Sequence, residues 1–273
     1  MAATETLIQV RKLRKTFRAP RGGTHVAVDD VSFEIAKGES FGLAGMSGSG
    51  KSTIGRIIMG LAKPTSGDVI FEGRSIVHHT KQDLAAVRSQ MQMVFQNPLA
   101  SMNPRRTAGS IIEVPLKSFA AGTKKQRKER VYELLDFVGL SPRHAEYYPH
   151  EFSGGQCQRL GIARALASKP KFIFLDEPVS ALDVSIQAQI LNLLKELQER
   201  FHLTYLVVAN NLSVERFIAD RLAIMSHGKI VELDIAEEIF RAPKHQRTKE
   251  LLSAILSPAS LDENDDKPIV KRQ

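Results

Sequence analysis

A glycine-rich segment at residues 45–53 limits most strongly what this chain can fold into. It matches the spacing G-x-x-x-x-G-K-[ST], which requires a strand before the loop and a helix after it. The flanking sequence supplies both, because the apolar residues 41–44 predict a strand and residues 51–61 predict a helix. A chance glycine-rich loop lacks this context. We therefore expect a phosphate-binding loop made of Gly45, Met46, Ser47, Gly48, Ser49, Gly50, Lys51, Ser52 and Thr53.

The residue types in this loop suit the phosphates of a nucleotide. Glycines permit a tight turn and remove side-chain bulk, so that backbone N–H groups can face phosphate oxygens. The start of the following helix adds a partial positive charge at the same place. Lys51 supplies a full charge to the β- and γ-phosphates, and Ser52 offers a hydroxyl oxygen to Mg²⁺. The expected ligands are ATP and Mg²⁺.

Two adjacent carboxylates follow an apolar run at residues 172–175, which predicts a buried strand. A strand with an aspartate at its carboxyl end is how P-loop enzymes place an acid beside Mg²⁺, and Asp176 stands there. Glu177 is placed to accept a proton from an attacking water, as a general base does. Alone, the pair also fits a capping or surface role before Pro178. The phosphate-binding loop upstream favours the catalytic interpretation.

A second potential anion site stands at the start of a helix predicted over residues 155–167. A serine N-cap followed by two glycines exposes backbone amides at a helix N-terminus. The residues concerned are Ser153, Gly154, Gly155 and Gln156. Their spacing also fits an ordinary well-capped helix, so both interpretations stay open at this point.

Strands alternate with helices along the chain, which predicts an α/β fold with a mostly parallel sheet. The strand-rich N-terminal part predicts an antiparallel β subdomain, and residues 97–150 predict an inserted helical subdomain. We expect an ATPase domain over residues 1–235, a helical extension over 236–258 and a disordered tail over 259–273. Strands are expected at residues 7–13, 26–35, 40–44, 68–71, 91–95, 171–175 and 204–208, and helices at 108–119, 123–138 and 184–200.

Composition narrows the setting of the protein. The chain has 273 residues, a net charge of +8 and a pI of about 9.6. Such a charge fits nucleic acid, an anionic membrane surface, or scattered solubilising side chains. The single cysteine, Cys157, excludes an internal disulfide and indicates a reducing, cytoplasmic setting. No apolar run is long enough to span a bilayer, and the polar N-terminus does not resemble a secretory signal.

The order of these motifs resembles that of the ABC (ATP-binding cassette) ATPase family over roughly residues 7–232. The resemblance implies that Gln96 touches Mg²⁺ and senses a transmembrane partner, and that Asp183 lies in a loop that communicates across a dimer. It implies that Phe17 stacks on adenine, although an ordinary core aromatic is the alternative. In this family two domains face each other head to tail. Ser153 to Gln156 are then expected to act on the partner's nucleotide.

One position departs from the family pattern. The family places a histidine after the strand that follows the dimer loop, where it contacts the γ-phosphate and the attacking water. This chain has Asn210 there, and an amide donates a hydrogen bond but carries no charge at neutral pH. Neither His202 nor His227 is placed to substitute. We expect slower hydrolysis at this site, by about 10²–10³-fold for one lost contact, unless the amide suffices.

Two further stretches, residues 95–105 and 245–255, resemble the ATP-binding subunits of oligopeptide, dipeptide and nickel importers. Gln246 and Arg247 depart from the usual Pro-Tyr of the second stretch. Some relatives carry a cysteine-ligated iron–sulfur cluster there, which one cysteine cannot build. The resemblance implies a second, related ATPase subunit, two transmembrane permease subunits and, indirectly, a solute-binding protein. It places the chain peripherally on the cytoplasmic face of the inner membrane.

Three other classes of function stay open at this stage. A soluble ABC ATPase acting on nucleic acid normally has a long coiled-coil insertion or two cassettes, and the chain has neither, so we expect no nucleic-acid partner. An exporter motor is disfavoured by the extension after Glu232. A cassette of reduced activity that binds ATP mainly as a dimer clamp is motivated by Asn210 and opposed by Lys51, Asp176 and Glu177.

Overall fold

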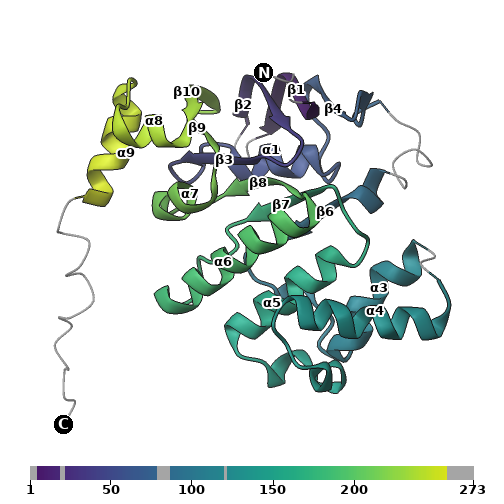
Figure 1. Cartoon of the computed structure of the whole chain (residues 1–273). Coiled ribbons are helices and arrows are strands. Elements are labelled where there is room, and N and C mark those ends of the chain that lie inside the picture. Colours follow the sequence, from purple (N-terminus) through teal and green to yellow (C-terminus); the bar gives the residue numbers. More distant parts are fainter. Residues whose placement is uncertain (1–4, 19–21, 79–86, 120–121, 257–273) are drawn as a thin grey trace, which may run out of the picture.

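The computed structural model describes residues 5–18, 22–78, 87–119 and 122–256 and shows two sheets, with a group of helices on the side opposite the N-terminal strands (Figure 1). The tail expected at residues 259–273 lies outside the described part. Within that part, one sheet has four strands in the order β2-β1-β4-β5 and the other has six in the order β10-β9-β3-β8-β7-β6.

The smaller sheet is the predicted antiparallel β subdomain. It consists of β1 (Thr6–Arg18), β2 (Thr24–Ala36), β4 (Ser66–Phe71) and β5 (Arg74–Ser75). Its strands pair antiparallel throughout. Buried and exposed residues alternate along residues 30–35 of β2, as expected for a sheet with one buried face, whereas register shifts interrupt the alternation in β1.

The larger sheet confirms the predicted α/β core. It consists of β3 (Ser40–Gly45), β6 (Met91–Val94), β7 (Phe172–Asp176), β8 (Thr204–Val208), β9 (Arg221–Ser226) and β10 (Lys229–Ile235). All neighbours pair parallel except β9 and β10. Strands β7 and β8 are buried along their whole length, as their continuous apolar sequences predict. The carboxyl ends of β3, β7 and β8 meet at one edge, where the site forms.

Helix α1 (Lys51–Ile58) lies between the two sheets (Figure 1). Ile54, Ile57 and Ile58 join one core cluster with apolar residues of both sheets. The helix ends before the predicted end at residue 61. Gly60 takes a positive φ of 65°, and the N–H of Leu61 bonds the carbonyl of Arg56, so the helix closes with a glycine-dependent turn.

The inserted helical subdomain contains α3 (Ala108–Ser118) and α4 (Lys124–Phe137), which pack against α5 (Gly154–Leu166). Thr107 and Thr123 cap α3 and α4, each accepting a hydrogen bond from a backbone N–H of the first turn. Together with α6 (Val184–Phe201) these helices share a second apolar core on the other side of the larger sheet. The three 3-10 turns of this region span Leu99–Ser101, Pro142–Glu146 and Pro149–Glu151.

The C-terminal helices are α7 (Leu212–Ile218), α8 (Ala236–Arg241) and α9 (Gln246–Leu256). Glu232 ties the extension to β10, because its carboxylate accepts hydrogen bonds from the backbone N–H groups of Lys244 and His245 and from the hydroxyl of Thr248. No helix in the described ranges is both long and apolar enough to cross a membrane.

Candidate functional site

The phosphate-binding loop joins β3 to α1 and depends on two glycines. Gly50 is the N-cap of α1 with φ 107°, and a Cβ there would lie 2.2 Å from the carbonyl oxygen of Ala27. Gly45 has φ 143°, and a Cβ there would lie 2.3 Å from the carbonyl oxygen of Met225. These positions therefore require glycine, both for their backbone conformation and for space.

Lys51 is buried at the start of α1 and points back over the loop. Its ammonium donates to the carbonyl oxygens of Gly45 and Met46, at 2.6 and 3.0 Å. Burial lowers the pKa of Lys51, while the charges of Glu177, Glu215 and Asp176 oppose this effect. The lysine thus provides a positive charge inside a loop of backbone amides, which suits a polyphosphate.

Ser52 and Asp176 come together from the start of α1 and the end of β7. The hydroxyl of Ser52 donates to Oδ1 of Asp176 at 2.9 Å. Both groups present oxygen atoms, the ligand type that Mg²⁺ prefers. The two residues were expected beside one metal ion, and the fold brings them into direct contact.

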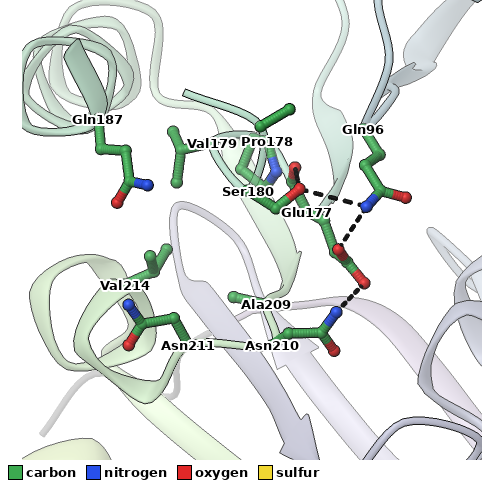
Figure 2. Close-up of a pocket in the computed structure, with 11 residues that line it drawn as sticks. Gln96, Glu177, Pro178, Val179, Ser180, Gln187, Ala209, Asn210, Asn211 and Val214 are labelled. Carbon is green, nitrogen blue, oxygen red and sulfur yellow. Dashed lines mark hydrogen bonds between the residues drawn. The ribbon is translucent and has the colours of Figure 1, made fainter. Parts of the chain in front are cut away.

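Glu177 follows Asp176 and turns away from the sheet with φ 50°. Figure 2 shows amide side chains on both of its carboxylate oxygens: Nε2 of Gln96 donates to Oε2 at 2.7 Å, and Nδ2 of Asn210 donates to Oε1 at 2.6 Å. The backbone N–H of Glu177 also donates to the carbonyl of Val208 at 2.8 Å. Two segments far apart in the sequence, at Gln96 and at Asn210, therefore hold this carboxylate in one orientation.

Two cavities meet at Glu177 and Asn210. One, of about 260 Å³, is lined by Phe17, His25, Ala27, Ser47, Gly48, Gly50, Lys51, Ser52, Thr53, Glu177 and Asn210. The other, of about 460 Å³, includes Gln96, Ser180 and Asn211 on its wall. Gly45, Met46 and Ser49 do not line the first cavity: Met46 points to solvent, and Ser49 is buried behind the loop.

Phe17 is a surface residue at the mouth of the first cavity and not a core aromatic, since 45% of it is exposed. The ammonium of Lys15 lies 5.0 Å from the centre of its ring. His25 pairs with Phe17 across β1 and β2 and lines the same cavity. Neither His202, at the C-cap of α6, nor His227, in the turn between β9 and β10, lines it.

Ser153 to Gln156 lie at the start of α5, away from both of these cavities. The hydroxyl of Ser153 accepts a hydrogen bond from the N–H of Gln156, and the Gln156 side chain accepts one from the N–H of Ser153. Ser153 and Gly154 are exposed. Asp183 is the exposed N-cap of α6, and its carboxylate makes no capping hydrogen bond with the described residues. Ser153, Gly154 and Asp183 thus face solvent, and none of the five residues reaches this chain's own phosphate-binding loop.

The sequence interpretation missed two residues near the site. His25 enters the cavity through strand register, and Glu215 of α7 is buried beneath the segment that carries Asn210. The pairing of β1 with β2 shifts register several times before Phe17, so alternation of buried and exposed residues was only a weak signal for His25. Glu215 had none, because a glutamate in a short helix normally faces solvent.

Comparison with known proteins gives consistent matches. The sequence profile described as ABC transporter matches residues 28–180. The oligopeptide transport ATP-binding protein OppF of Bacillus subtilis is 53% identical over 257 residues, covering 93% of this chain and 84% of the relative. The dipeptide transport ATP-binding protein DppF of Lactococcus lactis subsp. cremoris is 46% identical over 273 residues, covering 99% and 88%.

Solved structures match as well. A dimeric structure of a post-hydrolysis state of the ATP-binding cassette MJ0796, bound to ADP and Pi, superposes with a TM-score of 0.76 at 33% identity. The match covers 84% of this chain and 99% of the other.

Proposed function

This chain belongs to the ABC transporter family, and from that premise we propose that it is the ATP-hydrolysing subunit of a peptide importer. The single observation that carries the proposal is the convergence of Lys51, Ser52 and Glu177 on one cavity, with Asp176 hydrogen-bonded to Ser52 behind it. Its relatives are named as oligopeptide and dipeptide transport ATP-binding proteins. ATP is therefore the substrate, and its hydrolysis drives transport through membrane permease partners.

The residues present fit a bound Mg²⁺. Ser52 and Asp176 offer oxygens that already lie within hydrogen-bond distance of each other, and Gln96 stands nearby in contact with Glu177. We assign Ser52, Asp176 and Gln96 to hold the ion. Mg²⁺ bound there neutralises charge on the β- and γ-phosphates.

Glu177 is the proposed general base. In hydrolysis a water oxygen attacks the γ-phosphorus, the bond to the bridging oxygen of ADP breaks, and the proton of the water passes to a base. The carboxylate of Glu177 lines the same cavity as Lys51 and the loop glycines. Lys51 and the loop amides hold the phosphates of ATP. Phe17, at the mouth of the cavity, stacks on the adenine ring.

Asn210 is proposed to make hydrolysis at this site slow. Its amide donates to Glu177, but it carries no charge toward the γ-phosphate. We expect Asn210→His to raise turnover of the assembled transporter by about tenfold or more, since one positioned contact contributes 10²–10³-fold in rate. Unchanged turnover in this variant, with ATP binding intact, would mean that the amide suffices.

The position of Ser153 to Gln156 outside both cavities, with Ser153 and Gly154 exposed, supports a site completed across two chains. We propose that these residues and Asp183 contact the nucleotide and the loop of a second, related cassette, in a heterodimer on the cytoplasmic face of the membrane. In this arrangement residues 1–235 form the motor domain, and the helical subdomain at 97–150 meets the permeases. Residues 236–258 form the peptide-importer extension without an iron–sulfur cluster. A solute-binding protein then acts only indirectly.

Purification from gently solubilised native membranes in Mg²⁺-ATP tests this proposal. The expected result is co-purification of two polytopic membrane proteins and a second, related ATPase, with ATP hydrolysis that rises when peptide and a solute-binding protein are added. Recovery of nucleic acid or ribosomes in place of membrane proteins would overturn it. Loss in Glu177→Gln of the slow phase of hydrolysis, measured in a single turnover, assigns that phase to this chain.

A further inference from the structure

Glu215 is a buried carboxyl group that none of the roles above uses. It lies in α7, which begins directly after Asn210 and Asn211, and 0% of it is exposed. Burial raises the pKa of Glu215 to about 8, while the hydrogen bond from Ala209 and the charge of Lys51 act in the opposite direction. Burying such a group is costly unless it makes hydrogen bonds, so its contacts indicate its role.

The carboxyl group of Glu215 holds the end of β8. Its Oε1 accepts a hydrogen bond from the backbone N–H of Ala209 at 3.0 Å. Ala209 is the residue between the strand and Asn210, and it is buried. One residue earlier, the carbonyl of Val208 accepts the N–H of Glu177. Two neighbouring backbone groups at this strand end are therefore fixed, one by Glu177 itself and one by Glu215.

The other oxygen of Glu215 is packed against β3. Oε2 has no hydrogen-bond partner among the described residues. It occupies the space beside Gly42, where a Cβ would come within 2.3 Å of it. Gly42 has ordinary strand geometry, so its lack of a side chain serves this close approach and not a special backbone conformation. Gly42 and Glu215 are thus matched in shape.

We propose that Glu215 is a positioning residue for ATP hydrolysis, which fixes the amide of Ala209 and thereby holds Asn210 against Glu177. The inference rests on the proposed function. The chain of contacts runs from Gly42, through Glu215 and Ala209, to the side-chain bond of 2.6 Å between Asn210 and Glu177. Glu215 lines neither cavity at the site, so it acts through its neighbours and not on the substrate.

Two substitutions separate this role from a general contribution to packing. Glu215→Gln keeps an oxygen acceptor for the Ala209 amide and carries no charge, whereas Glu215→Leu fills similar space without an acceptor. In the assembled transporter we expect Glu215→Leu to lower kcat by about tenfold or more, since a small misplacement near the chemistry is costly. The KM for ATP stays within about twofold, because the phosphate-binding loop is untouched. Glu215→Gln retains the parent kcat.

Glu232→Leu is the matched control. It removes another buried carboxylate that accepts backbone N–H groups, but in β10, where it holds the C-terminal extension. A loss of stability with unchanged kcat is expected there. If Glu215→Leu does not fold, Glu215→Asp is used in its place. The aspartate carboxyl is one methylene too short to reach the Ala209 amide, so the same loss of kcat is expected.

Hydrogen exchange of the Ala209 amide in the full-length chain gives a readout that needs no activity. Protection is expected in the parent and in Glu215→Gln, and its loss in Glu215→Leu or Glu215→Asp. The inference is overturned if Glu215→Leu or Glu215→Asp keeps the parent kcat. It is also overturned if Glu215→Gln loses as much kcat as they do. If the parent complex binds ATP without hydrolysing it, the proposed function fails instead. Hydrogen exchange of the Ala209 amide then decides the role of Glu215. Loss of protection in Glu215→Leu supports the positioning role, and unchanged protection overturns it.

Discussion

Helices α1 and α5 both begin at a glycine-containing segment, but their first turns are satisfied differently. At α1 the N-cap is Gly50, which has no side chain to accept a hydrogen bond from the helix. At α5 Ser153 and Gln156 form a reciprocal capping box. The backbone amides at the start of α1 therefore stay available to bind an anion. At the start of α5 the capping box already satisfies them.

This difference matches the two proposed roles. The start of α1 receives the phosphates of the chain's own ATP, and the start of α5 completes a site only when a second cassette arrives. Their surroundings differ in the same sense. The ionisable residues Lys51, Asp176 and Glu215 are buried near α1, whereas the buried polar residue within α5 is Gln158, which does not ionise. Ionisable side chains are therefore buried around the start of α1, whereas α5 is surrounded mainly by apolar residues.

The largest effect expected from this contrast is a dependence of stability on pH. The pKa of Glu215 is about 8 in the folded chain against an ordinary value of 4.5. The folded state therefore holds the proton more tightly, and the stability this confers is lost as pH rises from 4.5 through 8. Each pKa unit corresponds to about 1.4 kcal/mol, so Glu215→Gln should gain stability over the parent by several kcal/mol across this window.

Thermal melting of the parent and Glu215→Gln between pH 5 and 8.5 measures this effect. Glu232→Gln is a control of opposite sign. Burial raises the pKa of Glu232, but hydrogen bonds from Thr248, Lys244 and His245 outweigh this and lower it overall. Its contribution is lost only as pH falls below 4.5, so between pH 5 and 8.5 the parent and Glu232→Gln should differ in stability by a constant amount. Melting curves of parent and Glu215→Gln that stay parallel over the whole range would contradict a proton on Glu215.

The next effect concerns the open helix start. Lys51→Ala removes a charge-assisted contact to phosphate, each worth about 1.5–3 kcal/mol, so ATP affinity of the isolated chain should fall roughly ten- to hundredfold. Arg56→Ala is the control on the same helix, because Arg56 is exposed in its last turn. Calorimetric titration with ATP measures both variants. Equal ATP affinity of the parent and Lys51→Ala would contradict the assignment of the start of α1 as the phosphate-binding site.

The smallest effect concerns the capped start. Ser153→Ala removes an N-cap, which typically costs about 1 kcal/mol of stability. ATP affinity of the isolated chain should not change, since Ser153 lies outside the cavity at the phosphate-binding loop. Denaturant unfolding and ATP titration of the same preparation check both parts. A fall in ATP affinity of the isolated chain would show that α5 acts on its own loop.

The sequence predicted the parts of the site that depend on local spacing. The loop at residues 45–53, Asp176 and Glu177 follow from strand-to-helix and strand-end patterns, and the helix start at Ser153 follows from its capping residue. Contacts made by packing could not be predicted this way. The place of Glu215 beside Gly42 depends on how α7 lies on β3, and the end of α1 depends on a turn at Gly60.

Single-turnover hydrolysis by the purified transporter, with Glu177→Gln in this chain alone, tests the central claim most directly. The parent should form ADP in two phases, a fast one from the partner's site and a slow one from the site with Asn210. In the variant the slow phase should fall by about 10²-fold or more, the usual contribution of a general base, while two ATP molecules remain bound. A slow phase of unchanged rate and amplitude would show that Glu177 does not carry hydrolysis at this site.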